Sequence, residues 1–143
     1  MYKRILVPID GSEHSLRALE VAKEIGEKFE SEIYIYSVVQ EISAIDPITT
    51  SYMITNRVPQ GAVDVTKKIL EDAKTKIENY KNEVHTDYEI GRPPELILRY
   101  ADNKNVDLIV MSNRGLGAFS RTFLGSVSNK VLNSTDKSVL LVK

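Results

Sequence analysis

The sequence predicts a doubly wound α/β fold, in which a parallel sheet lies between two layers of helices. Segments typical of strands alternate with segments typical of helices along the whole chain, and the chain ends on a strand. The strand segment Ile5–Val7 is a continuous apolar run, as expected of a strand buried on both faces, and Val106–Met111 is a second, mostly apolar run. The length of 143 residues fits one domain, and no boundary interrupts residues 1–143.

The first strand and helix have clear boundaries. Asp10 and Gly11 end the apolar run, and Ser12 is a good N-cap for the helix that follows. We expect this helix from Glu13 to Phe29, because apolar residues recur there at helical spacing: Ala18, Val21, Ala22, Ile25 and Phe29. A second strand is expected over Ile33–Val39.

The segment Gln40–Pro59 shows no clear periodicity. Unstructured connections longer than about 12–15 residues are usually functional or disordered. Two hypotheses stay open: a mobile surface loop, or a segment that closes over a ligand or contacts a partner subunit, with Tyr52 and Met53 supplying apolar contact. A second helix is expected over Ala62–Tyr80, with its core side formed by Val65, Ile69, Ala73, Ile77 and Tyr80.

The second half repeats the alternation. Apolar and polar residues alternate over Val84–Ile90, which favours a half-exposed strand at the edge of the sheet. Prolines 93 and 94 are well placed to open a helix over Glu95–Lys104. After the strand Val106–Met111 and a glycine-rich segment, we expect a helix over Ser126–Ser134 and a last strand over Val139–Val142.

Composition excludes several classes of function. The net charge of −1 gives no general attraction to nucleic acid or to an anionic membrane. The absence of cysteine excludes disulfides, thiol catalysis and cysteine-ligated zinc. The sequence has neither an apolar run of the roughly 18 residues that a membrane span needs nor a signal-peptide core, so a cytoplasmic location is expected.

The glycine-rich segment carries the main functional signal. Small residues between a strand and a helix N-terminus leave room for phosphate, which the free N–H groups and the helix dipole then favour. Here Gly115 follows the strand, and Gly125 and Ser126 precede the helix. Asp10 and Ser112 both follow predicted buried strands, so they face each other across one crevice if those strands are neighbours.

Over its whole length the chain resembles the universal stress protein family, in its ATP-binding branch. The resemblance rests on Ile5–Ser12, on Gly91-Arg92-Pro93, on Asp107–Met111 and on the glycine-rich motif. The family's motif is glycine, two residues, glycine, nine residues, glycine, then serine or threonine. Gly115, Gly125 and Ser126 match it, whereas Ser112 occupies the position of the first glycine.

The resemblance implies a five-stranded parallel sheet of order 3-2-1-4-5, of the adenine nucleotide alpha hydrolase-like kind. It also implies a homodimer paired through Val139–Val142, and bound ATP, or ADP or AMP, with Mg²⁺ or Mn²⁺ bridging the phosphates. By position, Pro8, Ile9 and Asp10 would line the adenosine end, with Val38 beside the base. Residues along the ribose and phosphates would be Met111, Ser112, Gly115, Gly125, Ser126, Val127 and Ser128.

Two departures from the family pattern bear on these expectations. If the site needs positive φ at position 112, serine would cost about 1 kcal/mol there and weaken ATP binding without excluding it. The family often has Cys-Pro before its final strand, where this chain has Lys137-Ser138. We expect that change to leave the last strand able to pair.

Several side chains have two readings. Asp10 is either a ligand for ribose, adenine or metal-bound water, or a turn-forming aspartate. Arg114 and Arg121 either pair with phosphate oxygens or are ordinary surface arginines. His14 and His85 lie far apart in the sequence, which argues against catalysis or metal binding by either, and Ser12 fits a cap better than a nucleophile.

The leading functional hypothesis is an ATP-binding sensor or switch with little or no hydrolysis. The sequence offers a phosphate cradle but no evident catalytic base and no dedicated lysine. The alternatives are a weak ATPase or nucleotidyl-transfer enzyme, and a dimerisation or interaction domain that has lost nucleotide, with Ser112 as the trace of that loss.

Overall fold

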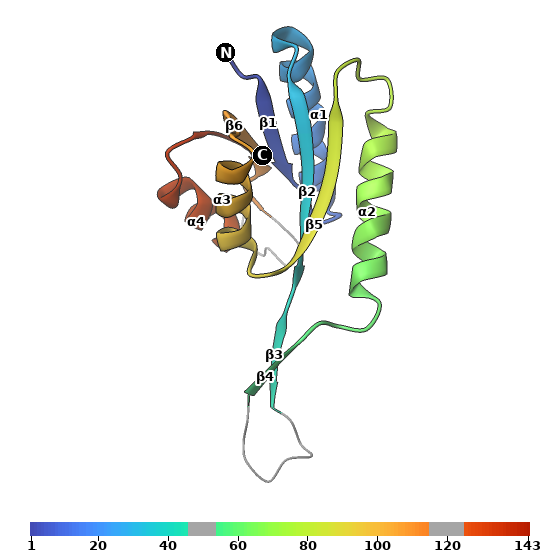
Figure 1. The fold of residues 1–143 in the computed structure, drawn as a ribbon, viewed down its shortest axis with the longest axis vertical. Coiled ribbons are helices and arrows are strands. Elements are labelled where there is room, and N and C mark those ends of the chain that lie inside the picture. Colours follow the sequence, from blue (N-terminus) through green and yellow to red (C-terminus); the bar gives the residue numbers. More distant parts are fainter. Residues whose placement is uncertain (46–53, 115–124) are drawn as a thin grey trace.

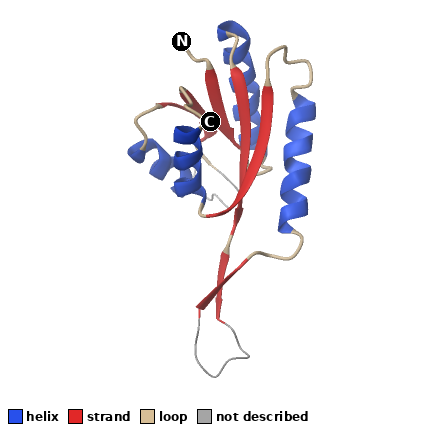
Figure 2. Cartoon of the chain, viewed as in Figure 1, coloured by secondary structure: helices blue, strands red, loops and turns tan. Residues whose placement is uncertain are grey.

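Five parallel strands form the central sheet of the protein (Figures 1 and 2). The computed structural model describes residues 1–45, 54–114 and 125–143. The strands are β1 (Arg4–Pro8), β2 (Glu32–Gln40), β5 (Val84–Gly91), β6 (Leu108–Ser112) and β7 (Ser138–Val142), and they lie in the order β5-β2-β1-β6-β7. This is the order 3-2-1-4-5 of the five predicted strands, so the predicted fold class is confirmed.

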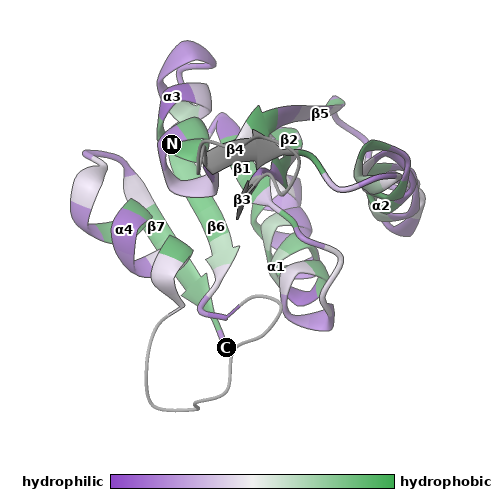
Figure 3. Ribbon diagram, turned by 90° about the horizontal axis from the view of Figure 1, so that it is seen from below, coloured by the Kyte–Doolittle hydropathy of each residue, from purple (hydrophilic) through white to green (hydrophobic). Residues whose placement is uncertain are grey.

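Four helices cover the two faces of the sheet. On one face, α1 (Glu13–Phe29) and α2 (Ala62–Lys76) cover a cluster that includes Ile5, Val7, Ile33 and Ile35. On the other face, α3 (Pro93–Asn103) and α4 (Ser126–Ser134) cover a cluster that includes Leu6 and Ile109. Alternate residues of a buried strand face opposite layers, which is why neighbouring apolar residues of β1 divide between two clusters. Figure 3 shows hydrophobic residues along the central strands and hydrophilic residues on the outer sides of the helices.

The predicted second helix is too long at its C-terminal end. Helix α2 ends at Lys76, and Ile77 donates its N–H to the carbonyls of Lys74 and Thr75 at the C-cap. The apolar periodicity continues past the helix because Ile77 and Tyr80 remain in the core after the chain leaves the helical path. Val65 was predicted to belong to the core, yet 60% of its surface is exposed.

The segment Gln40–Pro59 contains regular structure at both ends, so the prediction of an unstructured connection is wrong there. Strand β3 (Ile42–Ile45) pairs antiparallel with β4 (Ile54–Arg57), and this hairpin projects beyond the main sheet (Figure 1). Two strands of four residues that pair with each other carry too few residues for a recognisable period. Tyr52 and Met53 lie outside the described residues.

Strand β5 lies at one edge of the sheet and its residues are partly buried or exposed, as predicted for a half-exposed edge strand. The alternation of the sequence is not reproduced in the burial, since Thr86 and Asp87 are both exposed and so is Ile90. The predicted cap of α1 is also confirmed, since the Ser12 hydroxyl accepts a hydrogen bond from the N–H of Ser15 at 3.2 Å. None of the described helices is both long enough and apolar enough to cross a bilayer.

Candidate functional site

A crevice of about 650 Å³ opens where β1, β2 and β6 end. Such a volume lies within the range of about 300–1,000 Å³ that small-molecule sites occupy. In parallel α/β sheets, ligands bind beside the carboxyl ends of the strands at the point where the strand order reverses. Here β2 and β5 lie on one side of β1, and β6 and β7 lie on the other side. The crevice therefore lies at the topological switch point of the sheet.

The loop after β1 forms one wall. The N–H of Ile9 donates to the carbonyl of Tyr36 at 2.8 Å, and the Ser37 hydroxyl donates to the carbonyl of Ile9 at 2.8 Å. These two bonds extend the pairing of β1 with β2 beyond the last ladder residue. Asp10 lines the crevice, and its Oδ1 accepts the N–H of Ser12 at 3.0 Å. Asp10 thus forms the turn that was one of its two predicted roles.

The end of β6 forms the opposite wall, and two hydrogen bonds connect it to α4 and its N-cap residue. The Ser128 hydroxyl donates to the carbonyl of Ser112 at 2.6 Å, and the N–H of Gly125 donates to the carbonyl of Asn113 at 2.7 Å. The Ser112 hydroxyl donates to the carbonyl of Arg114. The end of β6 and the N-terminus of α4 therefore lie side by side.

Ser112 carries none of the backbone strain considered from the sequence. It is the last residue of β6, and it is not among the residues with positive φ in the described parts of the chain. The expected cost of about 1 kcal/mol therefore does not arise. Instead, the serine side chain supplies a hydrogen bond that glycine could not make.

The N-terminus of α4 is open toward the crevice. Ser126 and Val127 line the crevice, and Gly125, the N-cap residue, has no side chain with which to accept their N–H groups. The first N–H groups of a helix have no partner within the helix, so they remain available to an anion. By contrast, the N-terminus of α1 is capped by the Ser12 hydroxyl.

Arg114 is the cationic side chain among the described lining residues. Its Nε is buried and finds no hydrogen-bond acceptor among the described parts of the chain. A buried guanidinium nitrogen without an acceptor is costly, and an anion in the crevice would remove that cost. Arg114 and the open end of α4 make one end of the crevice favourable to negative charge.

The rest of the crevice is mostly apolar, and part of its lining was not predicted from the sequence. Helix α2 contributes Val65, Thr66 and Ile69, and α3 contributes Pro93 and Ile97. Strand β2 contributes Tyr36, Ser37, Val38, Val39 and Gln40, of which only Val38 was predicted. Val65 is exposed and lines the crevice, so it does not belong to the core. The sequence showed it only as an apolar residue near the start of α2.

The predicted site residues that the structure describes all line this crevice. Gly115, which was also predicted, lies outside the described residues. Arg121, a further candidate for phosphate contact, also lies outside the described residues. Those lining the crevice are Pro8, Ile9, Asp10, Val38, Met111, Ser112, Arg114, Gly125, Ser126, Val127 and Ser128.

The ionisable side chains of the described lining are few. His14 and His85 do not line the crevice, and Asp10 is its one described carboxylate. Burial, and then the hydrogen bond to the Glu89 carboxylate, raise the pKa of Tyr36 well above its usual value, so its hydroxyl stays protonated. The described residues thus provide a bed for an anion beside an apolar slot.

Comparison with known sequences gives one consistent result. The profile of the universal stress protein family matches residues 1–143. The universal stress protein YxiE of Bacillus subtilis is 33% identical to this chain, over 100% of both sequences.

Comparison with solved structures agrees. The structure of MJ0577, a universal stress protein of Methanocaldococcus jannaschii, has a TM-score of 0.76 and 27% identity, over 100% of this chain and 96% of that one. A universal stress protein solved in complex with cAMP has a TM-score of 0.72 and 25% identity, over 99% of this chain and 96% of that one.

Proposed function

The chain belongs to the universal stress protein family, and we propose that its crevice binds an adenine nucleotide, ATP in the first instance, as the ligand of a sensor or switch with little or no hydrolysis. One observation carries the proposal: the open N-terminus of α4 lies at the same crevice as Arg114 Nε, which has no hydrogen-bond partner among the described residues. Both features favour an anion, and they come from separate parts of the chain.

The adenosine would occupy the apolar part of the crevice. Pro8 and Ile9 would contact it from β1, and Val38 would lie beside the base. Asp10 would accept a hydrogen bond from the ribose or the adenine amine while its Oδ1 keeps the turn with Ser12. The cAMP complex of a relative supports an adenine ligand in this fold.

The phosphates would lie at the end of the crevice near α4. Gly125, Ser126 and Val127 would offer backbone N–H groups, and Arg114 would pair with phosphate oxygens. Met111, Ser112 and Ser128 would line the ribose and phosphate path, and Gly115 would complete the cradle. With Asp10 as the one described carboxylate of the lining, Mg²⁺ or Mn²⁺ would be held mainly by the phosphates.

Calorimetry with Mg·ATP, Mg·ADP, AMP and cAMP tests this proposal. Binding of ATP with one nucleotide per chain, together with ATP turnover at background level, is the expected result. Steady-state turnover well above background would favour the enzyme hypothesis. Absence of heat and of any rise in melting temperature at millimolar nucleotide would favour a nucleotide-free interaction domain.

We also propose a cytoplasmic homodimer. Strand β7 is an edge of the sheet, so Val139–Val142 present backbone groups on the side away from β6. An exposed edge is a template for pairing with another strand, and a second copy of the chain offers the same edge.

A further inference from the structure

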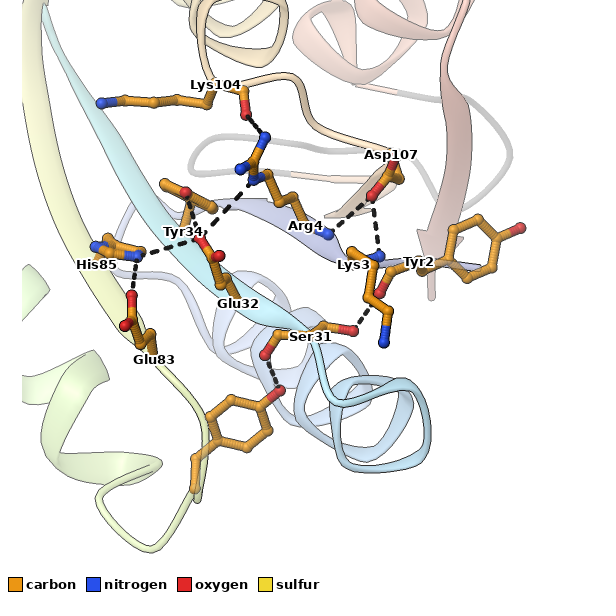
Figure 4. A network of polar contacts seen from close by, with 11 residues as sticks. Tyr2, Lys3, Arg4, Ser31, Glu32, Tyr34, Glu83, His85, Lys104 and Asp107 are labelled. Atoms are coloured by element: carbon orange, nitrogen blue, oxygen red, sulfur yellow. Dashed lines mark hydrogen bonds and ion pairs between the residues drawn. The ribbon is translucent and has the colours of Figure 1, made fainter.

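A cluster of three ligand-type side chains lies on the sheet away from the crevice. Glu32 is the first residue of β2, Glu83 directly precedes β5, and His85 is the second residue of β5 (Figure 4). One nitrogen and two carboxylate oxygens from these residues all lie within 4.8 Å of one another. The cluster is at the amino ends of the strands, whereas the crevice is at their carboxyl ends.

The separations from the His85 nitrogen to the two carboxylates are close to those between neighbouring ligand atoms around a tetrahedral ion. His85 Nε2 is 3.4 Å from Glu83 Oε2 and 3.5 Å from Glu32 Oε2. Bonds of about 2.05 Å from zinc to nitrogen and oxygen, arranged tetrahedrally, place neighbouring ligand atoms about 3.3 Å apart. The His85 nitrogen is therefore well placed to share one ion with either carboxylate, and all three ligand atoms lie within 4.8 Å of one another.

The imidazole nitrogen that faces the carboxylates is the second feature of the cluster that points to a cation. Nε2 of His85 is buried and lacks a hydrogen-bond partner among the described residues, even though the His85 side chain as a whole is 40% exposed. The two carboxylate oxygens lie 3.4 and 3.5 Å from this nitrogen, which is too far for good hydrogen bonds. At these distances the nitrogen and the oxygens are well placed to share a cation.

Neighbouring residues hold the cluster in position. The Tyr34 ring stacks on the His85 ring with centroids 4.5 Å apart, and the Tyr34 hydroxyl donates to Glu32 Oε2 at 2.7 Å. Partners that orient metal ligands in this way are a common feature of protein metal sites.

We propose that Glu32, Glu83 and His85 form a binding site for one divalent transition-metal ion, with zinc as the ion that the geometry fits. Three protein ligands leave the fourth tetrahedral position to water. Magnesium and calcium are disfavoured because they prefer oxygen ligands, and one of the three ligands is an imidazole nitrogen. The ion would link the start of β2 to the start of the edge strand β5.

Arg4 is the neighbour that opposes a cation. Its Nε lies 3.9 Å from Glu32 Oε2, and its Nη1 donates to the carbonyl of Lys104 at 3.5 Å. Both contacts are long, and the Arg4 side chain is exposed enough to turn toward solvent. Arg4→Gln should therefore tighten zinc binding, because it removes a positive charge that competes for Glu32.

Zinc titration by calorimetry, on tag-free protein stripped with chelator, tests the site. One zinc ion per chain is expected. Glu83→Gln and His85→Gln should each weaken binding at least tenfold. The matched controls are Glu71→Gln, an exposed glutamate on α2, and His14→Gln, the other histidine of the chain, and both should bind zinc as the wild type does.

Two further measurements keep the test decisive. Glu83 is 74% exposed, so Glu83→Gln should fold normally, and circular dichroism verifies this. Nitrogen NMR should show zinc shifting the Nε2 signal of His85 while that of His14 stays in place. Unchanged affinity in His85→Gln, equal losses in His14→Gln, or weak binding of several ions without saturation would each overturn the proposal.

Discussion

The Ser128 hydroxyl donates a hydrogen bond of 2.6 Å to the carbonyl oxygen of Ser112, and both residues are buried. One serine ends β6 and the other lies in the first turn of α4, so this bond fixes the helix N-terminus against the strand end. The direction of the open N–H groups of α4 depends on that attachment.

Ser128→Ala should lower both stability and nucleotide affinity. The substitution leaves the buried carbonyl of Ser112 without this donor, which costs about 1–3 kcal/mol in the free energy of unfolding. Ser126→Ala is the matched control, because Ser126 lines the crevice but is exposed. It should leave urea unfolding unchanged and weaken nucleotide binding moderately. Equal unfolding curves for Ser128→Ala and the wild type would contradict the structural role of this bond.

Gly125→Val should abolish nucleotide binding with the fold intact. The φ of Gly125 is −58°, a value that other residues adopt readily, so the substitution tests space for the ligand and not backbone strain. Calorimetry with Mg·ATP measures the loss, and Gly125→Ala should show a smaller one. Retained affinity in a folded Gly125→Val protein would place the phosphates elsewhere.

Gly26→Ala should destabilise the protein although alanine is the better helix former. Helix propensity favours alanine by about 1 kcal/mol. A Cβ at position 26, however, would lie 2.3 Å from the Tyr80 hydroxyl oxygen, and overpacking of this kind costs about 1–3 kcal/mol.

The double variant Gly26→Ala/Tyr80→Phe separates these effects. Removing the hydroxyl relieves the closest contact but loses the 2.6 Å hydrogen bond from Tyr80 to the carbonyl of Ser31. Urea unfolding of the wild type, Gly26→Ala, Tyr80→Phe and the double variant should therefore show that the double variant loses less free energy of unfolding than the two single variants together. Strict additivity would show that the helix and Tyr80 adjust independently.

Stability should fall with rising pH in the alkaline range, partly through Tyr34. Burial, and then the hydrogen bond to Glu32, raise the pKa of Tyr34 from 10.0 to about 12. Because the folded pKa is above the unfolded one, the contribution of Tyr34 is complete below pH 10 and is lost as pH rises through about 12. Urea unfolding between pH 9 and pH 12 should be less pH-dependent in Tyr34→Phe. The same dependence in both proteins would assign the effect to other tyrosines.

The protein should be a dimer in solution. Sedimentation equilibrium should give about twice the chain mass of 16.1 kDa if β7 pairs with its copy. A monomer at concentrations of about 100 μM would exclude pairing strong enough to matter in the cell.

The five strands of the main sheet could be predicted because each has a recognisable local pattern and is bounded by helix or turn signals, whereas their order was implied by the resemblance to the family. The β3–β4 hairpin could not, because its stability comes from pairing between two short segments and not from a local period. Positional matching to a family motif indicated the side of the crevice formed by β1 and β6. Lining from α2 and α3 was missed because it depends on how those helices cross the sheet.

Residue types alone also misjudged Ser112, and they did not indicate that Glu32, Glu83 and His85 lie together. Serine at a glycine position suggested strain, whereas the backbone there is an ordinary strand and the hydroxyl makes a local bond. The two histidines are far apart in the sequence, which argued against a metal site. The parallel register that places Tyr34 opposite His85, and so brings Glu32 near it, could not be deduced from spacing along the chain.

The 2.7 Å bond from the Gly125 N–H to the Asn113 carbonyl has a consequence for protein engineering. The bond joins the two ends of the connection between β6 and α4, which contains residues 115–124. The contact between the sheet and α4 therefore does not depend on the length of that connection. In general, doubling the number of residues in a surface loop adds only about 0.6 kcal/mol to the entropic cost of closing it. Replacing this stretch by cassettes of other lengths should therefore leave a folded scaffold, on which new ligand specificities can be selected.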